Sequence, residues 1–466
     1  MSLVALNLTE AAAGIRDGRF SSVELVADCL ERIDEIDREV EAWAFLDREH
    51  AMRQALAADD HRKQGKATGP LHGVPVGIKD IFDTGDMPTE FGSGLWAGRT
   101  PRRDATAVAR LRAAGAVILG KTVTTEYAYY HPGKTRNPHN PDHTPGGSSS
   151  GSAAAVAALM VPGAIGSQTN GSVIRPAAFC GVVGFKPTHG LIPRSGALEL
   201  SRTLDHVGAF GRSVADVALL AEVLVGFDQD DLDTRPAACP PFSAVAASEP
   251  PLPPRFAFVR SAVWDQAEPV TREAFAELVE ALGEASSEVE LGPGFDKVVD
   301  MHRTIMEVDM AHNLRRDYQR GGDKLSPRLR QAIERGRTHL AVDYCNALAG
   351  ITPLNQGLDH VFDEYDAILT PAAPGDAPVI ETTGSPIFCT TWTYLGVPAI
   401  SLPLMNSDTG LPLGVQLVGR RGNDARLLRT ACWLVKNAGH TRRGGRSKVP
   451  SAGSQSGPGA EKRKVR

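Results

Sequence analysis

Apolar residues recur at helical spacing through the first part of the chain. The run from Val23 to Ile36 has the pattern of an amphipathic helix, and Ser21 with Glu24 forms a capping box at its start. The stretch from Arg48 to Gly65 continues the same pattern. Residues 1–65 are therefore predicted to form an N-terminal helical segment.

From residue 66 to about residue 230 the pattern changes. Short β-branched runs alternate with predicted helices at 105–114 and 153–160. One such apolar run, 74–78, is followed directly by Lys79, and Gly73 and Gly85 bound this stretch. The run is predicted to be a short inner strand with the lysine at its end. This alternation is typical of an α/β fold in which a mixed β-sheet is covered by helices on both faces.

The second half of the chain is less regular. The proline-rich stretch 236–254 is predicted to be a surface loop or linker, and a variable helical region follows at 255–360, with helices at 272–282 and 327–348. Strands return within 365–435, at 367–369 and 399–402. We expect residues 1–440 to form a single catalytic domain, with residues 66–230 as its core.

The composition is that of an ordinary globular protein. The chain has 466 residues, of which 42% are hydrophobic and 23% are charged. The longest apolar stretch, Ala153–Gly166, is interrupted by Pro162 and is too short to span a bilayer. No signal peptide is indicated, and the six cysteines form no CxxC pair. These features predict a cytoplasmic enzyme with reduced thiols and no membrane association.

The charge is divided unevenly along the chain. Residues 441–466 carry a net charge of +7, whereas residues 1–440 carry −12. The basic segment has almost no apolar residues and is predicted to be a disordered tail. The acidic body argues against a nucleic-acid partner. None of the thirteen histidines belongs to an HExxH motif, so neither a metal nor a cofactor is expected, and a homodimer is left open.

Two motifs match by pattern but not by context. Residues 115–122 satisfy the phosphate-loop pattern GxxxxGK[ST], yet a predicted helix precedes them and 116–119 is itself an apolar strand. Residues 147–151 fit GxSxG, the nucleophile elbow, but the preceding segment NPHNPDHTPG cannot be the required strand. Neither match predicts function.

A glycine- and serine-rich stretch carries the strongest chemical signal. In PGGSSSGSAAAVAALMVPGAIGSQTNGSVIRPAAFCG (145–181), Ser148 and Ser172 lie twenty-four residues apart, and Lys79 lies upstream in HGVPVGIKDIFDTG. A serine hydroxyl needs an adjacent base, and a lysine can be that base only where its pKa is lowered. Separately, the stretch could be explained by close packing and Lys79 by a surface position. The combination favours catalysis.

Seven further segments extend the pattern, and with them the chain resembles the amidase signature family. They are 79–93, 116–128, 137–151, 181–196, 201–216, 365–374 and 396–403. The resemblance implies a Ser-cisSer-Lys triad, with Ser172 as the nucleophile, Ser148 as the cis-peptide serine that relays protons, and Lys79 as the base. Ser149 and Ser150 are alternative relay residues. The backbone N–H groups of Thr169, Asn170, Gly171 and Ser172 would form the oxyanion hole.

The nucleophile segment departs from the usual family pattern. Gln168 replaces an acidic residue, and the arginine lies three positions after the serine, at Arg175. This arrangement is similar to that of malonamidases, which implies that Arg175 binds a substrate carboxylate. The alternative is that Arg175 braces the loop by bonding main-chain carbonyls.

Three functions remain open at this point. The first is an amidohydrolase that cleaves a small-molecule amide to a carboxylate and ammonia or an amine. The second is an A-type glutaminase subunit of a tRNA-dependent amidotransferase, although segment 384–388 (GSPIF) lacks the acid that would hold the α-amino group of glutamine. The third is a binding protein without turnover. Co-purification of a second subunit favours the second function, and failure of a fluorophosphonate to label Ser172 favours the third.

Overall fold

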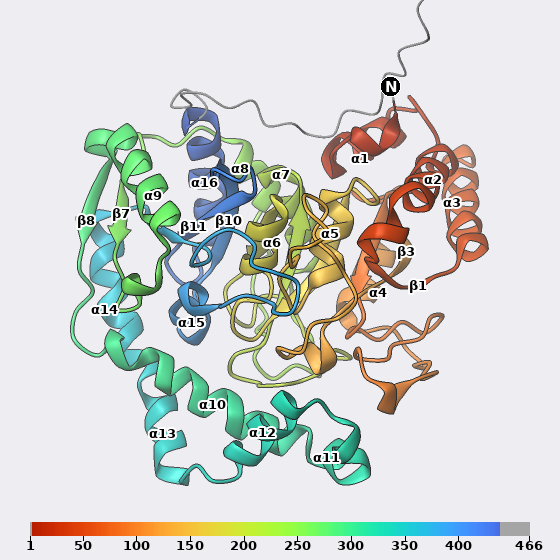
Figure 1. The fold of residues 1–466 in the computed structure, drawn as a ribbon. Helices are drawn as coiled ribbons and strands as arrows, with labels where there is room; N and C mark the ends of the chain where they lie inside the picture. Colours follow the sequence, from red (N-terminus) through yellow and green to blue (C-terminus); the bar gives the residue numbers. More distant parts are fainter. Residues whose placement is uncertain (1, 439–466) are drawn as a thin grey trace, which may run out of the picture.

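An eleven-stranded mixed sheet runs through the molecule (Figure 1). The computed structural model describes residues 2–438. Its strands are β1 Trp43–Leu46, β2 Pro75–Lys79, β3 Val117–Thr122, β4 Gly163–Gln168, β5 Val183–Lys186, β6 His206–Gly211, β7 Phe256–Val259, β8 Ser286–Val289, β9 Ala367–Pro371, β10 Ala399–Asn406 and β11 Pro412–Val418. They lie in the order β1-β3-β2-β4-β6-β5-β10-β11-β9-β7-β8.

The sheet is parallel around β2 and antiparallel on both sides of it. β2 pairs in parallel with β3 and with β4, whereas β4 pairs with β6, and β6 with β5, in antiparallel fashion. β7 forms a second parallel group with β8 and β9. The carboxyl ends of β2, β3 and β4 therefore meet at one edge of the sheet, which is where α/β folds usually bind ligands.

Helices cover both faces of the sheet. Adjacent residues of a strand point to opposite faces. In β5, the Cα of Gly184 faces Ala177 of α6, whereas the ring of Phe185 contacts Phe242 of α8. Helices α6 and α8 thus lie on opposite sides of the sheet.

The helices are α1 Leu8–Arg16, α2 Ser22–Val40, α3 Arg48–Lys63, α4 Thr106–Ala113, α5 Ser150–Ala157, α6 Ile174–Cys180, α7 Val214–Leu224, α8 Phe242–Ala247, α9 Pro269–Leu282, α10 Val298–Asn313, α11 Arg315–Gly321, α12 Pro327–Gly336, α13 Ala341–Ala349, α14 Ile351–Glu364, α15 Ile387–Tyr394 and α16 Asp424–Ala438.

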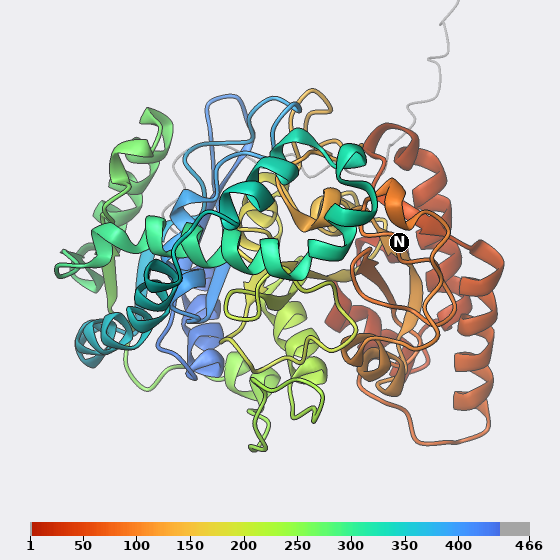
Figure 2. The same ribbon diagram turned by 90° about the horizontal axis from the view of Figure 1, so that it is seen from below.

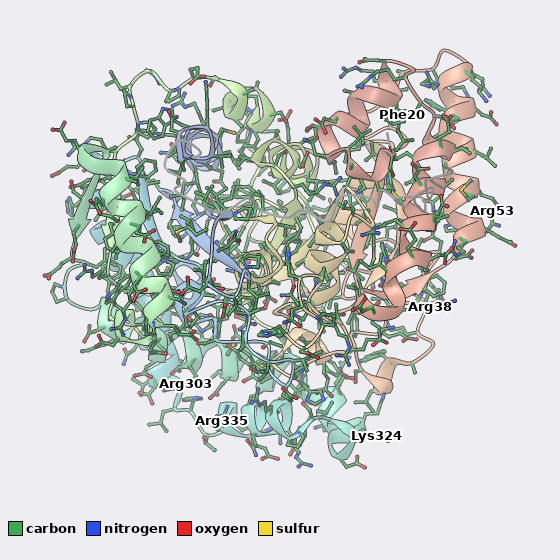
Figure 3. All side chains as sticks on the ribbon, turned by 45° about the horizontal axis from the view of Figure 1, so that its top comes forward. Phe20, Arg38, Arg53, Arg303, Lys324 and Arg335 are labelled. Atoms are coloured by element: carbon green, nitrogen blue, oxygen red, sulfur yellow. The ribbon has the colours of Figure 1, made fainter. Side chains whose placement is uncertain are left out.

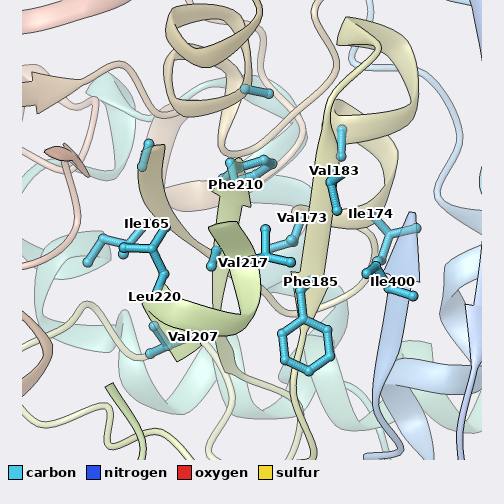
Figure 4. Close-up of a cluster of buried hydrophobic side chains, with 14 of the residues drawn as sticks. Ile165, Val173, Ile174, Val183, Phe185, Val207, Phe210, Val217, Leu220 and Ile400 are labelled. Atoms are coloured by element: carbon cyan, nitrogen blue, oxygen red, sulfur yellow. The ribbon is translucent and has the colours of Figure 1, made fainter. Parts of the chain in front are cut away.

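The hydrophobic core lies between the central strands and these helices. Figure 4 shows part of it, where Ile165 of β4 and Phe210 of β6 lie near Val217 and Leu220 of α7. All four side chains are completely buried. Burial of this kind contributes about 1.5–3 kcal/mol for each large aliphatic or aromatic side chain. All six residues of β4 are buried in this core, and the segment that follows β4 carries Ser172.

The N-terminal helices form as the sequence predicts. The Ser21 hydroxyl accepts a hydrogen bond from the backbone of Glu24, whose carboxylate in turn accepts one from Ser21, so the capping box is present. The structure adds strand β1 between α2 and α3, which sequence analysis missed because a four-residue run is too short to show a period. β1 pairs with β3 at one end of the sheet.

Two predictions for the second half are corrected. The proline-rich stretch contains the short helix α8, which packs against α16 and α7, because Phe242 is apolar enough to be fully buried. The predicted helix 327–348 is two helices, α12 and α13, since α12 ends at Gly336. Helix α9 contains the predicted helix 272–282.

Helices α10 to α13 form a separate layer below the sheet in Figure 1. Seen from below, α10 and α12 lie across the middle of the molecule (Figure 2). Their outward faces are charged, and Arg303 of α10 and Arg335 of α12 lie on the surface, as do Arg38 and Arg53 of the N-terminal helices (Figure 3). The inward face of α10 lies over the edge of the sheet where β4 ends, because His302 of α10 contacts Thr169, the residue that follows β4.

Among residues 2–438, no helix is long and apolar enough to cross a membrane. The predicted disordered tail, 441–466, lies outside the described residues. The single catalytic domain, the cytoplasmic location and the homodimer stay predictions.

Candidate active site

The sheet brings together two segments that are distant in sequence. β2 ends at Lys79, and β4, its parallel neighbour, ends at Gln168, with Ile78 in register with Ile165. Because parallel neighbours run in the same direction, their carboxyl ends lie at the same edge. Lys79 therefore lies beside Ser167, the penultimate residue of β4. The turn that holds Ser172 begins directly after β4.

Lys79 is completely buried and donates two hydrogen bonds. Its Nζ lies 2.7 Å from Oγ of Ser148 and 2.9 Å from Oγ of Ser167. Burial lowers the pKa of Lys79 well below its ordinary value, the charge of Arg175 lowers it further, and the nearby carboxyl of Asp205 opposes the shift. A lysine in this state is able to accept a proton from the serine hydroxyl that it contacts.

Ser148 is the only one of the three neighbouring serines whose hydroxyl contacts Lys79. The peptide bond between Gly147 and Ser148 is cis, and the carbonyl of Ser148 accepts a hydrogen bond from the N–H of Thr125 at 3.1 Å. The Ser149 hydroxyl instead donates to the carbonyl of Ser167, and the Ser150 hydroxyl donates to that of Val123. The geometry favours Ser148 as the relay over its two neighbours.

Ser172 lies in the tight turn between β4 and α6. Gln168 organises this turn, because its Oε1 accepts hydrogen bonds from the N–H groups of Val173 at 2.8 Å and Ile174 at 3.0 Å. Within residues 2–438, no hydrogen bond uses the N–H of Asn170, Gly171 or Ser172. These donors are thus available to a substrate oxyanion, as the oxyanion-hole prediction requires.

Asn170 and Gly171 are fitted closely to α15. The Asn170 side chain donates to the Tyr130 hydroxyl at 3.0 Å and accepts from the Thr390 hydroxyl at 2.8 Å. A Cβ on Gly171 would lie only 2.7 Å from Cβ of Pro386. The turn requires a residue without a side chain at position 171.

Two residues that sequence analysis did not single out brace Thr169. The Thr169 hydroxyl donates to Oδ1 of Asp205, and Nε2 of His302 donates to the Thr169 carbonyl at 2.9 Å. Burial raises the pKa of Asp205 to about 6 and lowers the pKa of His302 to about 4. Asp205 belongs to segment 201–216, which carries the family resemblance, so the sequence could have indicated its role. His302 lies in the variable region 255–360, where no sequence motif indicates a role for it.

Arg175 is buried at the start of α6. Its two terminal nitrogens donate to the carbonyls of Gly384 and Gly147, each at 2.6 Å, and its guanidinium lies 5.8 Å from the centroid of the Tyr130 ring. Its Nε has no partner, and within residues 2–438 no carboxylate forms an ion pair with it. Burial lowers its pKa, although an arginine remains charged at neutral pH.

A small cavity of about 10 Å³ brings these groups together. Both proposed catalytic serines and Arg175 line it. Its complete lining is Ala128, Tyr129, Tyr130, Ser148, Thr169, Asn170, Ser172, Arg175, Leu200 and Met306. Arg175 supplies the only charged group among them, so the described lining contains no carboxylate to bind an ammonium group.

The two motifs set aside by sequence analysis have structural roles. Lys121 of the phosphate-loop pattern is fully buried in β3 and donates to Thr89 at 2.6 Å and to the carbonyl of Phe82 at 3.0 Å. Ser149, the central residue of GxSxG, is fully buried and faces β4. Among residues 2–438, no group of three or more metal-binding side chains is placed to hold an ion.

A family model described as Amidase matches residues 24–428, and the chain belongs to this family. The chain is accordingly a hydrolase of carbon–nitrogen bonds other than peptide bonds.

The chain is similar to relatives of two kinds. The chain is 34% identical to the A-type subunit of glutamyl-tRNA(Gln) amidotransferase from Chloroflexus aggregans, over 94% of this chain and 98% of the relative. It is 35% identical to the putative amidase AmiD of Mycobacterium bovis, over 94% of this chain and 95% of the relative.

A solved structure confirms the predicted fold class. The peptide amidase of Stenotrophomonas maltophilia superposes with a TM-score of 0.82 at 28% identity, covering 92% of this chain and 96% of that chain. The large mixed sheet covered by helices is thus common to this chain and to amidases of known structure.

Proposed function

We propose that this chain hydrolyses a small amide through an acyl-enzyme on Ser172. The 2.7 Å hydrogen bond from Lys79 to Ser148 is the observation that carries the proposal, because it joins a base to a relay serine that lines the same small cavity as Ser172. In this scheme Lys79, when neutral, accepts a proton from Ser148, and Ser148 accepts one from Ser172 as Ser172 attacks the amide carbon.

The later steps use the same groups. The free N–H groups of the turn 169–172 would stabilise the oxyanion, and Ser148 would return its proton to the leaving nitrogen. Water would then hydrolyse the acyl-enzyme by the same relay, giving a carboxylate and ammonia or an amine.

Arg175 is proposed to bind a carboxylate on the acyl part of the substrate. A guanidinium has five N–H donors, and the two carbonyl contacts use only two of them. A buried cation without an anionic partner is unfavourable, and a substrate carboxylate would supply that partner.

The experiment that tests the nucleophile is covalent labelling followed by mass spectrometry. Ser172→Ala should abolish both turnover and labelling by a fluorophosphonate, while circular dichroism shows an unchanged fold. Ser148→Ala should lose less activity, because Lys79 can act through a water molecule. An adduct on a peptide that does not contain Ser172 would overturn the assignment.

The second candidate is the A-type glutaminase subunit, which the similarity to amidotransferase subunits favours. The lining of the small cavity argues against it. The segment 384–390 lies behind two lining residues, because the Gly384 carbonyl accepts a hydrogen bond from Arg175 and the Thr390 hydroxyl donates one to Asn170, and the segment contains no acid for the α-amino group of glutamine. Purification from the native host discriminates the two, because a stable second subunit with glutaminase activity would support the subunit function.

A further inference from the structure

The cavity at Ser172 is too small for a whole substrate. Its volume of about 10 Å³ is roughly that needed for one water molecule. A second cavity of about 230 Å³ adjoins it and shares Ala128, Thr169 and Leu200 with it. A long substituent does not fit the small cavity and extends into this second cavity, which we call the side chamber, whereas a short acyl group stays beside Arg175.

The inner end of the side chamber lies next to the proposed proton relay. Ser167 lines the chamber, and its hydroxyl accepts a hydrogen bond from Lys79, which also bonds Ser148. Ser148 is the group that would return a proton to the leaving nitrogen. A substituent on that nitrogen would therefore point toward the chamber, whereas Arg175 lines only the small cavity.

The walls of the side chamber are apolar near the catalytic edge. They are formed by Ile81, Phe82, Ala197, Leu198, Leu200 and Val207, and Leu232, which is 76% exposed, also contributes to the lining. Such a surface gains free energy by covering an alkyl chain, at about 0.8 kcal/mol for each buried CH₂ group.

The charges around the chamber exclude an anionic chain end. Arg194 is paired with Asp231 at 2.7 Å, and Arg202 is paired with Asp233 at 3.0 Å. Glu199 and Asp230 also line the chamber, and neither forms an ion pair with a residue of the described range 2–438. The free charge at the chamber is therefore negative.

We infer that the side chamber is a leaving-group subsite that takes the apolar, uncharged or cationic substituent of an N-substituted amide. This inference rests on the proposed function and specifies its substrate class: a small acyl group at Ser172 and an elongated amine in the chamber.

Two homologous series of substrates test the assignment. One series is N-alkylacetamides from methyl to hexyl, and the other is unsubstituted straight-chain amides from acetamide to octanamide. Each added methylene on nitrogen should raise kcat/KM by up to about fourfold until the chamber is filled. Lengthening the acyl chain should give no such rise. A preference for long acyl chains, or equal rates for all N-alkylacetamides, would overturn the inference.

Two variants of the chamber should shift this preference in opposite directions. Ala197→Phe narrows the chamber and should lower the ratio of kcat/KM for N-hexylacetamide to that for N-methylacetamide by about fifteenfold, the value of two buried methylenes. Leu198→Ala widens the chamber and should raise the ratio of kcat/KM for N-alkylacetamides with chains longer than hexyl to that for N-methylacetamide. Ala109→Phe, on the exposed face of α4, is the matched control and should leave the ratio unchanged.

Substrates whose N-alkyl chains end in opposite charges test the charge of the chamber. N-(5-aminopentyl)acetamide should be hydrolysed faster than N-(4-carboxybutyl)acetamide, and Glu199→Gln should reduce the difference. The opposite order would overturn the charge assignment.

Fluorophosphonate labelling distinguishes a failure of the proposed function from a failure of the subsite. If Ser172 is not labelled, the proposed function fails. If Ser172 is labelled but the rate does not respond to N-substituents, only the subsite fails.

Discussion

At the scale of single residues, the protonation state of Lys79 controls the proposed chemistry. The base has to be neutral, and burial lowers its pKa well below the ordinary value. We expect kcat/KM to rise with pH as Lys79 loses its proton, with a midpoint far below the free-lysine value of about 10.4, and to stay high in alkaline solution.

The control for this pH profile is Lys79→Ala. The variant should lose about 10²–10⁴-fold in kcat/KM, which is the usual contribution of a general base, and the rise with pH should disappear. An unchanged profile with near wild-type activity would show that Lys79 is not the base.

Arg175 makes a second prediction at this scale. Arg175→Lys keeps the positive charge but loses the planar fork. The KM for monoamides of dicarboxylic acids should rise by about tenfold relative to that for neutral amides, the value of one charge-assisted hydrogen bond. A fall in Tm is expected in any case, because the side chain also bonds two carbonyls. Equal losses on acidic and neutral substrates would mean that Arg175 only braces the loop.

At the scale of elements, the turn between β4 and α6 depends on its fit against α15. Gly171→Ala would place a methyl group 2.7 Å from Cβ of Pro386 and 3.2 Å from Sγ of Cys389. Relieving this overlap should cost about 1–3 kcal/mol of stability and should lower kcat, because the displaced turn carries the oxyanion donors.

Gly85→Ala is the matched control for the turn, since the nearest atom to its added Cβ would lie at 3.6 Å. Thermal unfolding and steady-state kinetics on one amide measure both variants. If Gly171→Ala behaved like Gly85→Ala, the close contact with α15 would not constrain the turn.

At the scale of the whole molecule, α10 links the helical layer to the catalytic edge. His302 is almost fully buried and donates to the carbonyl of Thr169, more than one hundred residues earlier in the chain. His302→Leu would leave that carbonyl without its donor and should destabilise the protein by about 1–3 kcal/mol. We also expect a lower kcat, because Thr169 precedes the oxyanion turn.

His302→Gln provides the comparison, because its side-chain amide can still donate a hydrogen bond. It should retain more of the stability and of kcat than the leucine variant, as measured by thermal unfolding and by turnover of one amide. Equal losses in both variants would show that packing, and not the hydrogen bond to Thr169, is the contribution of His302.

The local sequence determined the features that depend on near neighbours. The capping box at Ser21, the strand ending at Lys79 and the α/β pattern follow from spacing over a few residues, and the family resemblance identified the serines and the lysine. Strand β1 was not predicted because its four residues are too few to show a period, and helix α8 was missed because it is held by packing against α7 and α16. The break after α12, at Gly336, was also missed.

Tertiary structure alone decided which groups meet at the site. The parallel register of β2 and β4 brings Lys79 to Ser148 and Ser167, and the placement of α10 brings His302 to Thr169. The side chamber likewise combines residues from β6 and from several loops. These contacts join residues that are tens to more than a hundred positions apart, so they depend on strand order and helix packing, which hydrophobic periodicity along the chain does not specify.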